Sequence, residues 1–232
     1  MIFNSNKFDF WKIYESIKSF YTVSINGELT QLKELTDIIV DNIHDNEKFK
    51  SRWNDFTYEI ESQIGKQIIG TTYGQAPSFS SYVLLEKASL DNLIRTKELH
   101  FFVSLVGPFY TIIGQDNAHV IIEESEYRST SYLVVSPENE FAEVFQLLSK
   151  EIEKRFKGYR FIPFDIYKQS LKDIKIEYTN DNNNVVFHAL FNDFIDLTIS
   201  GRIGNECYKS EEWIREGYKD QDFGWTIYPP KE

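Results

Sequence analysis

Along the first 64 positions, apolar side chains recur at spacings of three and four residues, which is the period of an amphipathic helix. The sequence holds three such stripes: Phe10, Tyr14, Ile17 and Tyr21; Leu32, Leu35, Ile39 and Ile43; and Phe49, Trp53, Phe56, Ile60 and Ile64. Asn6 can cap the first helix, and the second should begin near Thr30. We therefore predict an N-terminal helical segment over residues 1–64. Residues 56–61 also alternate like a strand, which leaves that alternative open at the end of the third helix.

The composition changes over residues 65–81, where Gly65, Gly70, Gly74 and Pro77 are interspersed with serines. Glycine, proline and serine are residues of turns and loops. We interpret this stretch as a connection between the helical segment and an α+β body over residues 82–232. We expect the whole chain to form one continuous globular unit.

Beyond residue 81 the pattern changes to short runs typical of β-strands. Two runs, 99–106 and 109–113, flank Gly107-Pro108 and predict a hairpin whose strands are apolar on both faces and therefore covered on both. The other predicted strands are 82–85, a second pair formed by 119–123 and 131–135, and the later runs 174–178, 185–190 and 194–200.

Several independent signals agree on a long helix over residues 137–157. Ser136 can cap it, Pro137 suits its first position, and Gly158 can end it. Its apolar stripe consists of Phe141, Val144, Phe145, Leu148, Ile152 and Phe156. With helices and strands segregated along the chain, we predict an α+β fold. In this fold an antiparallel sheet of about six to eight strands packs against helix 137–157 and the N-terminal helical segment.

The chain carries a formal net charge of −11. Nucleic acids and anionic membranes bind clustered Lys and Arg, so both are disfavoured as partners. An acidic chain is instead steered towards basic proteins, although acidic composition also serves solubility alone. The sequence shows no secretory signal, no apolar run long enough to span a membrane, and one cysteine, Cys207. We therefore expect a soluble, cytoplasmic protein.

Recognisable catalytic and cofactor motifs are absent from the sequence. The four histidines lack the spacing of a metal site, and there is neither a glycine-rich phosphate loop nor a nucleophile elbow. Glu206 precedes Cys207, and its charge should raise the pKa of the thiol and weaken it as a nucleophile. We expect no catalytic residue, no metal ligand and no cofactor. Carboxylate pairs of a hydrolase meet in space rather than in sequence, so that class stays open.

Two acidic regions are candidates for binding a basic protein. In the first, Glu123, Glu124 and Glu126 precede Tyr127, with no helix terminus to account for their charge. In the second, Trp213 and Trp225 lie within an acidic C-terminal tail. Acidic residues beside aromatic ones are typical of surfaces that recognise basic partners. For the tail, docking on the body of the protein is the alternative, because exposed clustered aromatics are rare in stable monomers.

Three function classes remain. The leading hypothesis is a non-catalytic binding protein, namely an acidic inhibitor of the immunity type that neutralises a basic protein in the bacterial cytoplasm. The alternatives are a hydrolase that uses carboxylates, and a structural subunit of a larger assembly. A pocket with convergent titratable groups would favour the hydrolase, a broad acidic face with exposed aromatics the inhibitor, and a large flat apolar face the subunit.

Overall fold

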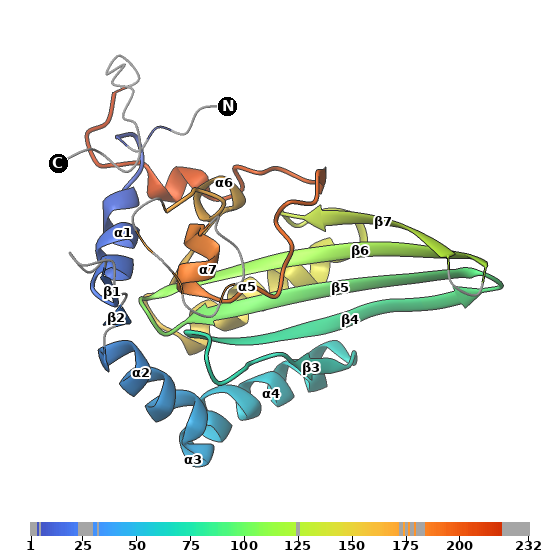
Figure 1. Ribbon diagram of the computed structural model, residues 1–232, viewed down its shortest axis with the longest axis horizontal. Helices are drawn as coiled ribbons and strands as arrows, with labels where there is room; N and C mark the ends of the chain where they lie inside the picture. The colour runs from blue at the N-terminus through green and yellow to red at the C-terminus, as the bar shows by residue number, and fades with distance from the viewer. Residues whose placement is uncertain are drawn as a thin grey trace.

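The computed structural model describes residues 4, 6–22, 30–31, 33–123, 126–171, 174, 176, 179 and 184–219. Its central sheet is built from β3 (Ile68–Gly70), β4 (Ser78–Leu90), β5 (Leu93–Ser104), β6 (Phe109–Glu123), β7 (Glu126–Val134), β8 (Arg160–Phe161) and β9 (Gly201–Ile203). These seven described strands are arranged in the order β3-β4-β5-β6-β7-β9, with β8 beside β6 (Figure 1).

Helices lie around this sheet, so the fold is α+β as predicted (Figure 1). The α-helices of the described residues are α1 (Phe10–Lys18), α2 (Lys33–Ile39), α3 (Asn46–Phe49), α4 (Asp55–Ile64), α5 (Ala142–Arg155), α6 (Phe164–Tyr167) and α7 (Val186–Leu190). A separate two-stranded pair consists of β1 (Tyr21–Thr22) and β2 (Thr30–Gln31). No described helix combines the length and the apolar character needed to cross a bilayer.

The sheet is mixed rather than purely antiparallel. Neighbouring strands from β3 to β7 pair antiparallel, whereas β8 pairs parallel with β6 and β9 pairs parallel with β7. The predicted hairpin at Gly107-Pro108 is confirmed, because β5 and β6 pair antiparallel from Val103 opposite Tyr110 outward. Both parallel strands are only two or three residues long, which is too short to carry a hydrophobic period in the sequence.

Both faces of the sheet are covered at the end near Phe102, as the sequence indicated. Phe101 and Val103 belong to a core cluster with α4 and α5, whereas Phe102 between them belongs to a second cluster with α1, α6 and α7. Adjacent residues of a strand point to opposite faces, so a continuous apolar run supplies both cores. The N-terminal helices contribute to both clusters, with Phe10 in one and Trp53 in the other.

The predicted N-terminal helices are present, with shorter bounds. A π-helical turn over Val40–His44 continues α2, and a second over Lys50–Asn54 leads into α4. The strand alternative for residues 56–61 is wrong, because this segment is part of α4. Gly65 ends that helix with a φ of 62°, a left-handed conformation that glycine adopts without a steric penalty.

The helix predicted over residues 137–157 begins later. Residues Asn139–Phe141 form a 3₁₀ turn, and the α-helix runs only from Ala142 to Arg155. The Ser136 hydroxyl does not cap it and instead accepts a hydrogen bond from the Asn205 backbone N–H at 2.8 Å. A tertiary contact therefore uses the residue that local sequence rules assign to the cap.

Several of the predicted strands differ in the structure. Residues 82–85 and 119–123 are parts of the longer strands β4 and β6, so 119–123 is not a separate strand. Residues 185–190 were predicted as a strand, yet Val186–Leu190 is the helix α7, with all five residues buried. An apolar run of that length does not distinguish a strand from a helix buried all round. No strand forms over 194–200, and most of 174–178 lies outside the described residues.

Candidate functional site

The long strands β4 to β7 extend beyond the helices at the end that carries the β4–β5 and β6–β7 connections (Figure 1). We call this end, residues 84–97, 116–123 and 126–132, the sheet tip. Its two hairpins are joined through Asn92, whose side-chain amide donates to the Ile121 carbonyl at 3.0 Å. In return, the Ile121 N–H donates to the Asn92 carbonyl at 2.7 Å. The sheet tip is therefore one tied unit rather than two independent hairpins.

Large apolar side chains are exposed on the sheet tip. Leu90 is 69% exposed, and Ile121 and Ile122 are each 43% exposed. The exposed large apolar side chains of the tip are Leu90, Leu93, Val120, Ile121, Ile122 and Tyr132. Leu90, Leu93 and Val120 lie directly opposite one another on adjacent strands, so they share one face. Clustered exposed apolar side chains mark interaction surfaces in folded proteins.

Ion pairs at the base of the tip compensate its charged side chains. Arg95 donates two hydrogen bonds to Asp116, at 3.0 and 2.7 Å. Lys97 contacts Glu86 at 2.9 Å and also contacts Glu140. Burial opposes the charge of Lys97, but the hydrogen bonds that its ammonium donates to the two carboxylates outweigh burial and raise the pKa of this lysine. These charges are satisfied internally, which leaves the far end of the tip as the part available to a partner.

The first predicted binding region lies at that far end. Glu123 and Glu126 are paired across the end of the β6–β7 hairpin, and Tyr127 lies opposite Ile121 in the register. Glu124 is outside the described residues. The backbone thus places Glu123 and Glu126 close to Ile121 along the β6–β7 hairpin. The apolar part was not predicted, because Val120, Ile121 and Ile122 belong to a run that the sequence identifies only as a strand.

The second predicted region is not a binding surface at Trp213, and this prediction is corrected. Trp213 is 0% exposed, and its indole N–H donates to the Phe161 carbonyl at 2.7 Å. The Arg160 guanidinium lies over its ring, 3.8 Å from the centroid. The alternative, docking on the body, therefore holds for Trp213, since a buried ring cannot meet a partner. Trp225 lies outside the described residues.

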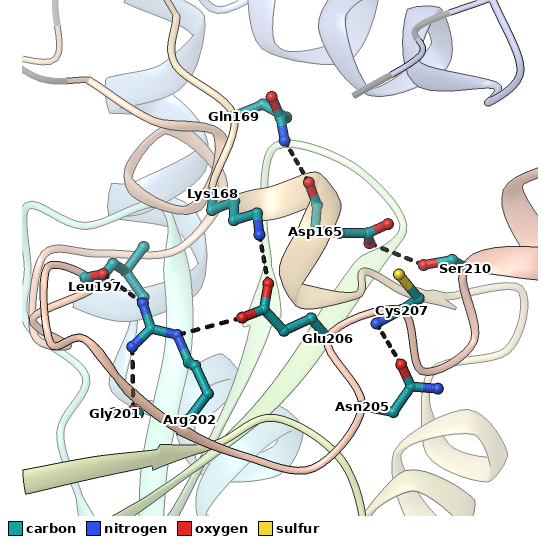
Figure 2. A network of polar contacts seen from close by, with 10 residues as sticks. All are labelled: Asp165, Lys168, Gln169, Leu197, Gly201, Arg202, Asn205, Glu206, Cys207 and Ser210. Carbon is teal, nitrogen blue, oxygen red and sulfur yellow. Dashed lines mark hydrogen bonds and ion pairs between the residues drawn. The ribbon is translucent and has the colours of Figure 1, made fainter. Parts of the chain in front are cut away.

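A second polar cluster surrounds Cys207, between α6 and the turn that precedes the 3₁₀ helix Ser210–Trp213 (Figure 2). The Ser210 hydroxyl donates to Asp165 at 2.8 Å, and the Cys207 thiol also hydrogen-bonds to this carboxyl group. Burial, and then the charge of Asp165, raises the pKa of the Cys207 thiol. The pKa of the thiol is raised, as the sequence predicted, but Glu206 contributes less to this rise than burial and Asp165 do. A thiol held neutral in this way is a poor nucleophile.

The rest of this cluster connects α6 with the chain around β9 (Figure 2). Lys168 contacts Glu206 at 2.5 Å, and the Arg202 guanidinium lies 4.0 Å from the same carboxylate. Arg202 also donates to the backbone carbonyls of Gly201 and Leu197, each at 3.2 Å. These contacts hold two chain segments together. We interpret the cluster as structural rather than catalytic, because its cations are bound to internal acceptors.

A third cluster lies where α5 meets Lys209. The Tyr110 hydroxyl donates to Glu153, and the Lys209 ammonium contacts Glu153 at 2.9 Å. Burial alone would raise the pKa of Glu153, but the hydrogen bonds from Tyr110 and Lys209 outweigh it and lower that pKa. Lys209 has a φ of 61°, which costs free energy for a residue other than glycine. The ion pair between Lys209 and Glu153, together with the hydrogen bond from Tyr110 to the same carboxylate, offsets that cost and fixes Lys209 against the core.

The partly buried carboxyl of Asp165 predicts a pH-dependent stability. Burial raises its pKa, while hydrogen bonds from Ser210 and Cys207 oppose the rise. The folded state therefore holds the proton to a higher pH than the unfolded chain, whose carboxyl titrates near 3.8. The contribution of Asp165 to stability is then largest below that value and is lost as the pH rises through the folded pKa.

The replacement Asp165→Asn, which cannot titrate, isolates this effect. Unfolding free energies of both proteins in urea should show the wild type losing stability relative to the variant as the pH rises from about 4 to 7. A difference that grows in favour of the wild type over this range would contradict the assignment of burial as the dominant cause.

The histidines are separated in the structure as in the sequence. His44 contacts the Gly74 carbonyl at 3.0 Å, and the buried His100 contacts Glu98 at 3.1 Å. Within the part of the chain that the structure describes, no group of three or more His, Cys, Asp and Glu residues could hold a metal ion. The absence of a cofactor stays a prediction.

Comparisons with protein-family models, curated proteins and solved structures found no match for this chain. Its function must therefore be inferred from the surfaces and clusters described above.

Proposed function

We propose that this chain is a non-catalytic binding protein that uses the sheet tip to dock onto a basic protein. More specifically, we propose an inhibitor of the immunity type, which neutralises its partner in the bacterial cytoplasm. The observation that carries the proposal is the convergence of exposed apolar side chains and acidic residues at one projecting end of the sheet. Interfaces commonly combine an apolar centre with a polar rim, and the residue types at this end of the sheet fit that combination.

Charge supports a basic partner. The net charge of −11 would attract a positively charged protein over a distance of about 8–10 Å at physiological salt. Glu123, Glu124 and Glu126 would then orient the encounter, while Leu90, Leu93 and Val120, which share one face, would supply buried area after docking. The clusters at Cys207 and Lys209 are internally satisfied and give the hydrolase alternative no comparable support.

The triple replacement Glu123→Lys, Glu124→Lys and Glu126→Lys tests the proposal. Association with the basic protein should slow by about tenfold or more at low salt, because electrostatic steering acts mainly on the association rate. The measurement is surface plasmon resonance against the purified protein that binds the tagged chain in its native cells. Stability in urea should stay within about 0.5 kcal/mol of the wild type.

A matched control reverses three exposed acids elsewhere: Glu47→Lys, Glu59→Lys and Glu143→Lys. Both variants change the net charge equally, so a slower rate in the sheet-tip variant alone identifies the recognition surface. If both variants associate at the wild-type rate, the acidic end is not the recognition surface and its charge serves solubility. If the purified chain instead turns over a small substrate, the hydrolase alternative takes the lead.

A further inference from the structure

The sheet tip has two outer edges, one on β4 and one on β7. On the outer side of β4, strand β3 pairs only with Ser81–Val83. On the outer side of β7, strand β9 pairs only with Tyr132–Val134. Further towards the tip, no described strand pairs with the outer side of β4 or β7. Unpaired strand edges are templates for adding another strand, and proteins usually protect them.

The edge of β4 is protected in three ways. A register shift between Leu84 and Glu86 interrupts the regular pairing with β5. Glu86 and Lys87 place charges along the same stretch, and the Lys66 ammonium donates to the Leu85 carbonyl at 3.1 Å. Bulges and charged side chains are the usual means of preventing a strand from adding to an edge.

The edge of β7 has much less protection. Its register with β6 is continuous from Tyr127 to Val134, and the stretch contains no proline and no lysine. Arg128 is its one charged residue, and Ser129 and Thr130 are exposed and small. An approaching strand would meet few obstacles along this side.

The backbone groups that face outward on β7 follow from its pairing with β9. The Val135 N–H donates to the Ile203 carbonyl at 3.0 Å, so Val135 directs its backbone towards the outer side. Because this direction alternates along a strand, Ser131, Ser129 and Tyr127 direct theirs outward too. Arg128 and Thr130 face β6 instead.

We propose that the outer edge of β7, from Tyr127 to Ser131, adds an extended segment of a basic protein as a further strand of the sheet. This inference rests on the proposed function and names its binding mode. The backbone of Ser129 would supply the central hydrogen bonds, as in other cases of strand addition. The hairpin end, where Glu123 pairs with Glu126, adjoins this edge, and its acidic sequence favours positive charge on the added strand.

The first test measures hydrogen exchange of single backbone amides by NMR. The probe is a capped peptide of about eight alternating lysine and valine residues, which is the length of an ordinary strand. On its addition, exchange at Tyr127, Ser129 and Ser131 should slow by about tenfold or more, with little change at Arg128 and Thr130, which β6 already protects. A peptide of alternating glutamate and valine should have no such effect. Protection along β4 instead, or equal protection by both peptides, overturns the proposal.

The second test compares proline replacements on the two edges. Ser129→Pro removes an outward N–H and is compatible with an edge strand, whereas Ser89→Pro is the same change on the β4 edge. The lysine-valine peptide should bind the Ser129→Pro variant about tenfold or more weakly and the Ser89→Pro variant nearly as well as the wild type. Equal binding to both variants overturns the proposal. The exchange measurement on the wild type stays decisive if a variant fails to fold.

The two proposals fail in different ways. Suppose that charge reversal at the sheet tip weakens binding of a basic partner, but that this partner binds the Ser129→Pro variant as tightly as the wild type. The strand addition is then wrong and the proposed function stands. If the peptide protects the β7 edge but charge reversal leaves binding of the native partner unchanged, the proposed function is wrong.

Discussion

Replacement of Trp213 by alanine should lower the free energy of unfolding by about 3–5 kcal/mol, since it empties a fully buried site. The same change removes the hydrogen bond from the indole to the Phe161 carbonyl and the contact with Arg160. The hydrogen bond from the Asp9 N–H to the backbone carbonyl of residue 213, at 2.7 Å, does not depend on the side chain and remains available in the variant. Urea unfolding monitored by circular dichroism measures the loss.

Trp11→Ala is the matched control, because this tryptophan is only partly buried on α1. It should cost clearly less than Trp213→Ala, since more of its ring is already in water. Equal losses in the two variants, or a loss below about 1 kcal/mol at Trp213, would mean that Trp213 does not anchor the C-terminal segment to the core.

Replacement of Leu148 by alanine should cost about 2–5 kcal/mol. Leu148 lies at the centre of the buried face of α5, is 0% exposed, and belongs to the same core cluster as Phe145 and Phe101. The loss combines the lost burial of the side chain with the cavity that rigid neighbours leave open. Its midpoint in urea should shift while the dependence on urea concentration stays the same, because the folded state keeps its extent.

Gln146→Ala on the exposed face of the same helix separates packing from helix propensity. Alanine is the better helix former, so this variant should be within about 0.5 kcal/mol of the wild type. A small effect at Leu148, comparable with that at Gln146, would show that the buried face of α5 does not contribute to the core as described.

The core of this protein was largely predictable, because burial and periodicity are coupled. Phe145, Leu148 and Ile152 recur with the helical period and are all buried. Phe101 and Phe102 belong to an uninterrupted apolar run and supply opposite faces of the sheet. In both cases the residue type at a position and its place in the pattern indicate whether that side chain is buried.

The ends of elements were less predictable, because long-range contacts compete with local signals. Ser136 has the side chain of a helix cap, but its hydroxyl is used by the Asn205 N–H, 69 residues away. Val186–Leu190 has the β-branched and aromatic residues of a strand, yet it is a short helix buried on all sides. Neither outcome depends on residues near in sequence, so local rules could not give it.

The candidate site also has a part that the sequence predicted and a part that it did not. Glu123, Glu124, Glu126 and Tyr127 could be selected from the sequence, because a charge excess is visible without a structure. The exposure of Ile121 and Ile122 could not, because an apolar run in a strand ordinarily indicates burial. Trp213 shows the converse, since an aromatic residue in an acidic tail gives no local sign of the pocket that buries it.

By itself, the sequence determined the α+β class, the two-faced core at Phe101 and Phe102, and the acidic character of the β6–β7 hairpin end, because each follows from the order of residue types along the chain. Only the tertiary structure decided that β4 to β7 extend beyond the helices that cover them (Figure 1). It also decided that the outer edge of β7 at Ser129 has no described neighbouring strand. The physical reason is that exposure depends on where distant segments stop. The length of β6 follows from its own residues. How much of β6 is covered depends on where α5 and the chain around β9 end, and these segments are distant from β6 in the sequence.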